Sequence, residues 1–319
     1  MKNRDIEKVL YIMNQIQKLK LNSTISLLAR IVIIFSGLIL PRLIIANYGA
    51  ETHGLVNSIT QFLGVITLLD MGVGVVVQSA LYRPLVENNT KQISSILIAA
   101  KKYFRKIAYV LIAYVLGLII FYPLIIETTK SHLSVVFLIL AMFISQFGLY
   151  YFGVVNEILL SANQQDYIQL GSEIIVVILN LIVSVFLINL GVSIEVVKLG
   201  SGLIYLIRPV YLSIYIKKNF DIDYDIEIED DPLPQKWNGV GQHIAYSINN
   251  SADVIVLTLF SSLESVSVYS IYNMVISAVK MVVTSLTTGI QSFFGNLYAS
   301  DELDSLNNYF DRIEWIIHT

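Results

Sequence analysis

Polar side chains recur along two apolar stretches of this sequence at the spacing of a single helix face. In residues 265–298 they are Asn273, Ser277, Lys280, Thr284, Thr287 and Gln291. In residues 55–80 the corresponding positions hold Thr60, Gly64, Thr67, Met71, Gly74 and Gln78. Steps of three and four keep each set on one face of a helix. Such polar groups can hydrogen-bond a ligand and are costly to place against lipid, so they predict a polar groove inside a membrane.

The two stretches also resemble each other. Each ends in a Gln-Ser pair, and each follows a short loop that contains an acid. The two acids, Glu51 and Glu264, are 213 positions apart, as are the two Gln-Ser pairs. Related helices with polar faces predict two related halves around a water-accessible cavity, which is typical of transporters.

Ionisable side chains inside apolar spans are the other candidates for a site. A charge at the centre of a span costs about 2.5–3.5 kcal/mol on insertion scales, so it needs a partner or water. Arg30 and Asp70 differ in predicted depth by only ~6 Å. They could line the cavity and meet an anionic headgroup or a proton, or they could form a buried ion pair that holds two helices together. Asp253 and Lys280 are related in the same way, and the position of Lys280 on the polar face favours the cavity.

Other ionisable residues predict little chemistry. Arg208, which precedes Pro209, is expected to reach the membrane surface, and Glu157 is expected at the interface. The four His residues are far apart and lack metal-ligand spacing, and the chain has no Cys. No nucleotide-binding motif and no nucleophile–base pattern is present. We therefore expect no metal site, no cofactor and no catalytic residue.

Composition places the chain in a bilayer. Of its 319 residues, 55% are hydrophobic and 14% are charged. A soluble protein would carry about 25% charged residues. The net charge of −3 gives no reason to expect nucleic acid as a partner. The sequence predicts an all-α integral membrane protein.

Apolar runs predict eight complete spans, each able to cross ~30 Å of hydrocarbon. They are 24–46, 55–80, 107–126, 133–159, 168–189, 196–216, 239–260 and 265–298, and a ninth is expected to begin near Ile313. Segments on one side hold Lys2, Arg4, Lys8, Lys18, Lys20, Arg83, Lys91, Lys101, Lys102, Arg105, Lys106, Lys217, Lys218, Lys236 and Arg312. The other side holds only Lys130. This asymmetry predicts a cytoplasmic amino terminus.

An acidic segment divides the predicted spans. Residues 217–238 carry seven Asp and Glu residues followed by Pro232 and Pro234, which is typical of a solvated linker. We expect a six-helix amino-terminal bundle in residues 1–216, the linker in 217–238, and the first helices of a pseudo-repeated second bundle in 239–319.

Short motifs resemble those of bacterial polysaccharide flippases. The first loop and second span match the patterns YGAExxGL and LLDxGxG through Tyr48, Gly49, Ala50, Glu51, Gly54, Leu55, Leu69, Asp70, Gly72 and Gly74. The segment from Ile248 to Val275 looks like the seventh and eighth helices of that family, with an acid at Asp253 and a Tyr269-Ser270 pair. These flippases belong to the multidrug/oligosaccharidyl-lipid/polysaccharide exporter superfamily.

The resemblance implies a function in cell-surface polysaccharide biosynthesis. Such proteins move polyprenyl-pyrophosphate repeat units of O-antigen (as in lipopolysaccharide), capsule or teichoic acid from the inner to the outer face of the bacterial cytoplasmic membrane. The implied partners are lipid-linked oligosaccharide, membrane lipids, and polysaccharide polymerase and chain-length proteins. The family usually has twelve to fourteen spans, so this chain is expected to be truncated.

Three alternatives stay open. A small-molecule exporter of the same superfamily would prefer an acidic, aromatic cavity to one that contains Arg and Lys. A membrane polysaccharide polymerase or ligase would need catalytic residues in a large outer loop, and the predicted outer loops are short. A truncated copy without function would follow from the missing spans.

Overall fold

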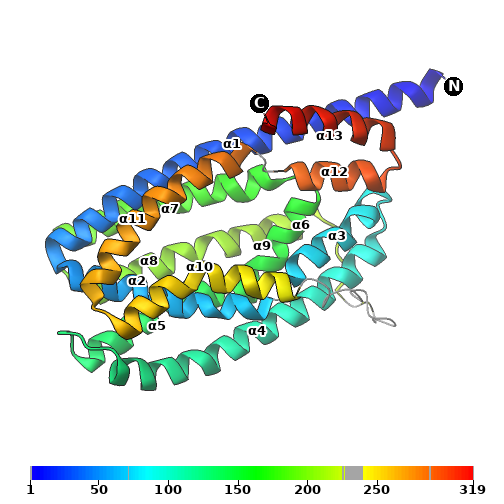
Figure 1. Ribbon diagram of the computed structural model, residues 1–319. Helices are drawn as coiled ribbons and strands as arrows, with labels where there is room; N and C mark the ends of the chain where they lie inside the picture. Colours follow the sequence, from blue (N-terminus) through cyan, green and yellow to red (C-terminus); the bar gives the residue numbers. More distant parts are fainter. Residues whose placement is uncertain (1, 71, 225, 227–239, 287–288, 319) are drawn as a thin grey trace.

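The computed structural model describes residues 2–70, 72–224, 226, 240–286 and 289–318. All regular structure in these residues is helical. Five helices in the described part are long and apolar enough to cross a membrane, or six if one bent pair is a single span. This confirms the prediction of an all-α integral membrane protein (Figure 1).

Each predicted span overlaps one or more helices, although α1 and α4 begin well before the apolar runs that predicted them. The first part of the chain forms α1 (Lys2–Tyr48), α2 (Ala50–Gly64), η1 (Val65–Asp70), α3 (Val73–Val86), α4 (Thr90–Ile125), α5 (His132–Gly148), η2 (Leu149–Gly153), α6 (Val154–Ala162), α7 (Asp166–Asn189), α8 (Ile194–Tyr205) and α9 (Ile207–Asn219). The second part forms α10 (Val240–Phe260), α11 (Leu263–Leu286), α12 (Ile290–Ala299) and α13 (Leu303–His318). Most of the predicted linker lies outside the described residues, and its first residues belong to α9.

Both polar stretches are broken helices rather than the continuous spans that the sequence predicts. The first is bent by 48° between η1 and α3, where Gly72 has a φ of 74°. In the second, α12 follows Gly289, whose φ is 87°. Glycine adopts this left-handed backbone conformation without the steric cost of a Cβ atom. Both stretches are therefore interrupted, but the two glycines are 217 residues apart, so the breaks differ by four residues from the 213-residue repeat.

The same repeat corrects the prediction for the ninth span. α2 begins at residue 50 and α11 at residue 263, and α4 begins at 90 and α13 at 303, so both pairs are 213 apart. The helix that we expected to begin near Ile313 thus begins ten residues earlier. The reason is that the first turns of α4 and α13 are amphipathic, and a search for continuous apolar runs misses them.

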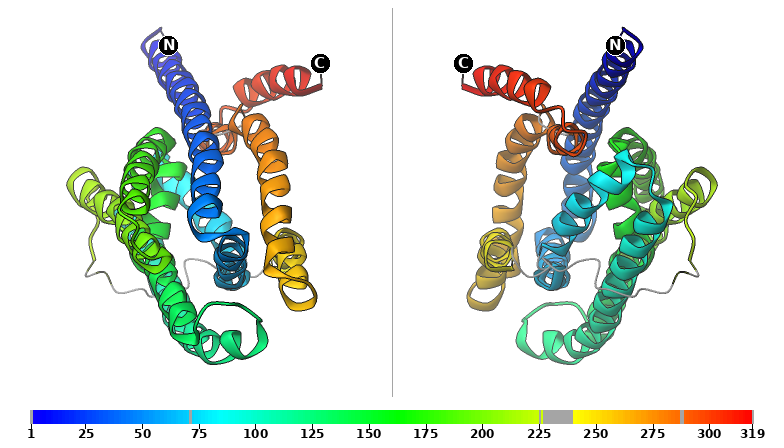
Figure 2. Two further views of the ribbon diagram at one scale, coloured as in Figure 1. Left: turned by 90° about the vertical axis from the view of Figure 1, so that its left-hand side faces the viewer. Right: turned by 90° about the vertical axis from the view of Figure 1, so that its right-hand side faces the viewer.

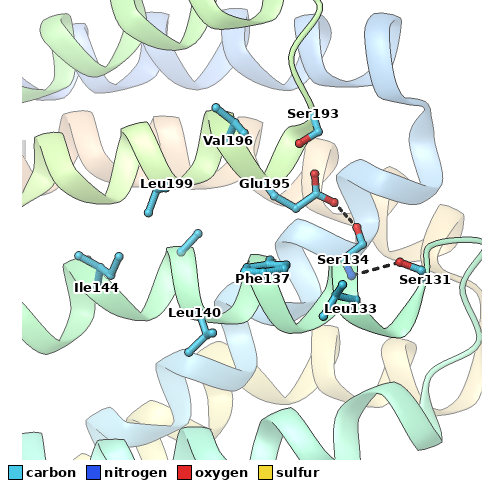
Figure 3. Close-up of a pocket in the computed structure, with 11 residues that line it drawn as sticks. Ser131, Leu133, Ser134, Phe137, Leu140, Ile144, Ser193, Glu195, Val196 and Leu199 are labelled. Atoms are coloured by element: carbon cyan, nitrogen blue, oxygen red, sulfur yellow. Dashed lines mark hydrogen bonds between the residues drawn. The ribbon is translucent and has the colours of Figure 1, made fainter.

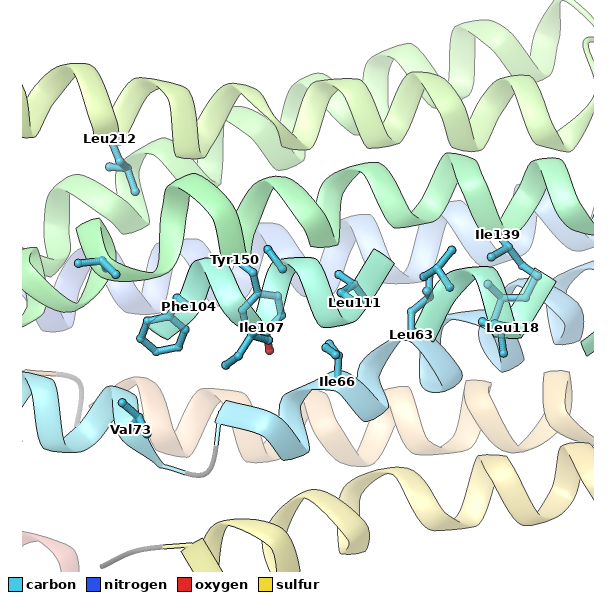
Figure 4. Close-up of a cluster of buried hydrophobic side chains, with 14 of the residues drawn as sticks. Leu63, Ile66, Val73, Phe104, Ile107, Leu111, Leu118, Ile139, Tyr150 and Leu212 are labelled. Atoms are coloured by element: carbon cyan, nitrogen blue, oxygen red, sulfur yellow. The ribbon is translucent and has the colours of Figure 1, made fainter. Parts of the chain in front are cut away.

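The helices pack around α1, which lies between α7 and α11 (Figure 2). A buried apolar cluster joins η1, α4 and η2 through residues such as Ile66, Phe104 and Tyr150 (Figure 4). Large apolar side chains also cover the outside, for example Phe121, which is 62% exposed. On a soluble protein so much exposed apolar surface would be abnormal, but in a bilayer it contacts acyl chains.

The two ends of the bundle differ. Short connections at Gly49, 126–131, 190–193 and 261–262 lie at one end, which we call the loop end (left in Figure 1). The other end carries the amino terminus, α13 and basic residues of α4 and α9, and we call it the basic end (right in Figure 1).

Candidate functional site

The two repeated stretches pack directly on each other, and we call this contact the seam. α2 packs against α11, and α3 packs against α12. A Cβ atom added at Gly54 would lie 1.7 Å from the carbonyl oxygen of Leu263, and one at Gly295 would lie 2.3 Å from the ring of Tyr82. Small residues permit such close approach of membrane helices. Glycine is therefore required near both ends of the seam.

Polar groups also meet across the seam. His53 Nδ1 lies 2.8 Å from Ser267 Oγ, and Gln78 Nε2 donates to Ser292 Oγ at 3.0 Å. Each of these pairs is 214 residues apart in sequence, close to the 213-residue repeat. When an axis relates two copies, a residue can contact its counterpart in the other copy only if both lie beside that axis. The seam therefore follows a pseudo-twofold axis that runs from the loop end to the basic end.

The structure brings one predicted site residue, Gln78, directly to the opposite repeat. The others lie along the same helices with different exposure. Asn273, Ser277 and Thr67 are half-buried, and Thr60, Lys280, Thr284 and Gln291 are exposed. The hydroxyls of Thr60, Thr67 and Thr284 donate to backbone carbonyls of their own helical turns. Met71 and Thr287 lie outside the described residues. The shared groove thus stays a prediction.

Two cations lie at the same depth beside the seam. Arg30 on α1 is eighteen residues before Tyr48, and Lys280 on α11 is seventeen residues after Leu263. Since Tyr48 and Leu263 are both at the loop end, each cation is about 26 Å from that end along its helix. The two helices pack together. Arg30 and Lys280 therefore share one level, in the half of the bundle nearer the basic end.

The expected acidic partners make other contacts. Among the described residues, the ion pairs are Arg83–Glu87 and Arg208–Glu157, so Arg30–Asp70 and Asp253–Lys280 are not among them. Asp70 Oδ1 accepts a hydrogen bond of 3.4 Å from Gly74 N, and Asp253 accepts one of 2.5 Å from the hydroxyl of Tyr269. Asp70 takes this position because the break at Gly72 exposes free N–H groups of the first turn of α3.

The expectations for Arg208 and Glu157 were wrong. Instead of reaching the surface separately, they pair across α6 and α9, with Nη2 and Oε1 3.2 Å apart. Glu157 Oε1 is buried and makes no hydrogen bond with the described residues. The π-helical turn η2 and the neighbouring Pro209 shape this contact, since a Cβ at Gly153 would lie 3.1 Å from Pro209 Cβ. A π-turn shifts the helix register, which residue spacing alone did not indicate.

A groove of about 710 Å³ lies apart from the seam, between α5 and α8 near the loop end (Figure 3). Leu133, Phe137 and Leu140 contribute to its mostly apolar wall. Polar groups gather at one end, where the hydroxyl of Ser134 donates to Glu195. This groove suits an acyl chain, because the walls offer dispersion contacts and few polar groups.

Two solved structures share this arrangement of helices. A structure designated protein A aligns with a TM-score of 0.70 at 12% identity over 89% of this chain and 66% of that chain. The MATE multidrug transporter DinF-BH, solved with a bound ligand, aligns with a TM-score of 0.66 at 13% identity over the same shares. No protein-family model and no curated protein matches the sequence.

The chain is thus a multi-pass membrane protein with a MATE-like transporter fold. It spans slightly less than two thirds of the length of these two structures. Similarity at 12–13% identity shows the fold alone, so the resemblance to polysaccharide flippases stays a prediction.

Proposed function

We propose that this chain translocates lipid-linked oligosaccharide, a polyprenyl-pyrophosphate repeat unit, from the inner to the outer face of the bacterial cytoplasmic membrane. The observation that carries the proposal is the shared level of Arg30 and Lys280 on packed helices, outside the ion pairs of the described residues. A pyrophosphate needs cations to offset its charge in a low-dielectric cavity, and both arginine and lysine bind phosphate oxygens strongly.

The rest of the proposed mechanism follows from the polar helices. Thr60, Thr67, Gln78, Asn273, Ser277, Thr284 and Gln291 would hydrogen-bond sugar hydroxyls, while Asp70 and Asp253 would lie beside the path. The lipid tails would stay in the bilayer. The basic end would face the cytoplasm, as the distribution of Lys and Arg predicts. Residues 1–216 and 239–319 would belong to two bundles joined by the linker 217–238, and polymerase and chain-length proteins would receive the product.

A second candidate is export of a small organic cation. It is supported by the fold of the MATE multidrug transporter and by the contact of Asp253 with Tyr269 between α10 and α11. A carboxylate beside an aromatic ring binds organic cations through charge and cation–π attraction. The two functions need different groups, and variants can therefore separate them.

The test is binding by the purified chain in detergent, with a polyprenyl pyrophosphate and a cationic dye as separate probes. We expect Arg30→Gln and Lys280→Gln each to weaken pyrophosphate binding by about tenfold or more, since charge-assisted contacts contribute about 1.5–3 kcal/mol. Lys20→Gln, an exposed cation on the same helix as Arg30, is the matched control and should bind normally. Two results together would favour the second candidate. Wild type would not bind the pyrophosphate, and Asp253→Asn would lose binding of the dye.

A further inference from the structure

Basic and aromatic side chains surround a second cavity, at the basic end and away from the seam. Its volume is about 370 Å³, and α4, η2, α6, α9 and the segment after α9 line it. α4 contributes Lys101 and Arg105, α9 contributes Ser213 and Lys217, and the turn of η2 and α6 contributes Tyr151 and Asn156. Tyr224 closes it from the segment that follows α9. None of these residues belongs to the helices of the seam, so the cavity is separate from the proposed transport site.

The cations of this cavity are oriented by aromatic rings. Lys101 Nζ donates to the hydroxyl of Tyr224 at 3.1 Å and lies 4.4 Å from the centroid of its ring. The guanidinium of Arg105 lies 5.0 Å from the ring centroid of Tyr151. Cation–π contacts hold such side chains in place without neutralising their charge. Lys101, Arg105 and Lys217 are also outside both ion pairs of the described residues.

Hydrogen bonds between its own residues hold the far wall of the cavity together. Asn156 Nδ2 donates to Ser213 Oγ at 2.9 Å and to the carbonyl oxygen of Phe152 at 2.7 Å. The π-helical turn η2 places Tyr151 and Phe152 at this wall, and π-turns are frequent at functional sites. The three cations, which are the charged groups of the cavity, form a site for phosphate oxygens.

The surroundings of the cavity indicate the source of the phosphate. Phe152, which lines it, is 47% exposed, and Ile214, beside Ser213 on α9, is 63% exposed. These apolar side chains face acyl chains if the helices span a bilayer. The cavity therefore lies at the boundary between the basic end and the lipid-facing surface, where the headgroup of a membrane lipid is found.

We propose that this cavity binds the phosphate of an anionic phospholipid from the membrane leaflet at the basic end. The phosphate would contact Lys101, Arg105 and Lys217, and the acyl chains would lie along Phe152 and Ile214. An adjoining hollow of about 470 Å³ shares Lys101, Arg105 and Tyr224 and adds Lys102 and Lys106, which extends the positive surface toward neighbouring headgroups.

The test is lipid retention by the full chain in mild detergent, measured by native mass spectrometry. Phosphatidylglycerol and phosphatidylcholine with identical acyl chains are added in equal amounts. We expect wild type to retain phosphatidylglycerol preferentially, and Lys101→Gln/Arg105→Gln to lower that preference at least about fivefold. The matched control is Lys91→Gln/Lys218→Gln, which removes the same charge from α4 and α9 outside the cavity and should keep the preference.

Three results would overturn the proposal. They are equal retention of the two lipids by wild type, an equal loss of preference in both double variants, and displacement of phosphatidylglycerol by millimolar inorganic phosphate, which would indicate a soluble anion. Circular dichroism checks that each variant is helical. If the site variant does not fold, Tyr224→Ala provides the test, because it removes the ring that holds Lys101 and lies outside the helices. An unchanged preference in that variant would also overturn the proposal.

Discussion

At the residue scale, one ion pair joins two helices of the amino-terminal bundle. Arg208 on α9 and Glu157 on α6 are both mostly buried, and Arg208 Nη2 lies 3.2 Å from Glu157 Oε1. A buried pair contributes little compared with a well-packed apolar pair, but removal of one partner leaves an uncompensated charge. The pair therefore serves as a tether between α6 and α9 rather than as a ligand site.

This tether can be tested by unfolding. We expect Glu157→Gln or Arg208→Gln alone to lower the free energy of unfolding by about 3–5 kcal/mol, and the double variant to recover most of that loss. The measurement is the helical circular dichroism signal as a function of urea concentration, with the same detergent for every variant. The exposed pair Arg83–Glu87 is the control, since Glu87→Gln should cost about 0–1 kcal/mol. A double variant as unstable as the single ones would contradict the tether.

At the element scale, the seam depends on glycine where two helices approach closely. Gly54 on α2 faces the backbone of Leu263 at the start of α11, and backbone cannot move aside as a flexible side chain can. Gly64, at the end of the same helix, has nothing within 4 Å of an added Cβ atom. The two glycines therefore differ in packing while they share a helix.

The pair provides a matched experiment. Gly54→Ala should separate α2 from α11 and lower the thermal unfolding temperature, with an expected cost of about 1–3 kcal/mol for overpacking. Gly64→Ala should leave the protein as stable as wild type or slightly more stable, by up to about 1 kcal/mol. Equal stability of the two variants would show that α2 and α11 do not pack as described.

At the scale of the whole molecule, the loop end and the basic end should face opposite sides of the membrane. The absence of Cys from the chain allows single-cysteine labelling without further changes. Ser261 lies in a short connection at the loop end, and Asp221 follows α9 at the basic end. Both are exposed in the structure.

We expect an impermeant maleimide to label Ser261→Cys in intact bacteria and Asp221→Cys only after the membrane is permeabilised. The physical reason is the excess of Lys and Arg at the basic end, which favours retention in the cytoplasm. The unmodified chain, which should stay unlabelled, is the control. The opposite labelling pattern would show that the orientation is reversed and that the proposed lipid site faces the outer leaflet.

The sequence by itself determined the all-α membrane class and the 213-residue repeat, because apolar length and 3.6-residue periodicity are local properties of the chain. It did not predict the breaks in the two polar stretches. The motif resemblance and the repeat also predicted a transporter, and the fold is shared with the MATE multidrug transporter DinF-BH. Gln78 was found from its spacing alone, although its contact with Ser292 was not predictable from one helix.

Only the tertiary structure decided which charged groups meet. Asp253 accepts a hydrogen bond from the hydroxyl of Tyr269, because the rotation of packed helices sets which side chains face each other. Arg208 pairs with Glu157, which follows the π-turn η2. The cavity around Tyr224 likewise joins three segments that are up to 123 residues apart. Such contacts depend on the packing of whole helices, and a local pattern of residue types carries no information about that packing.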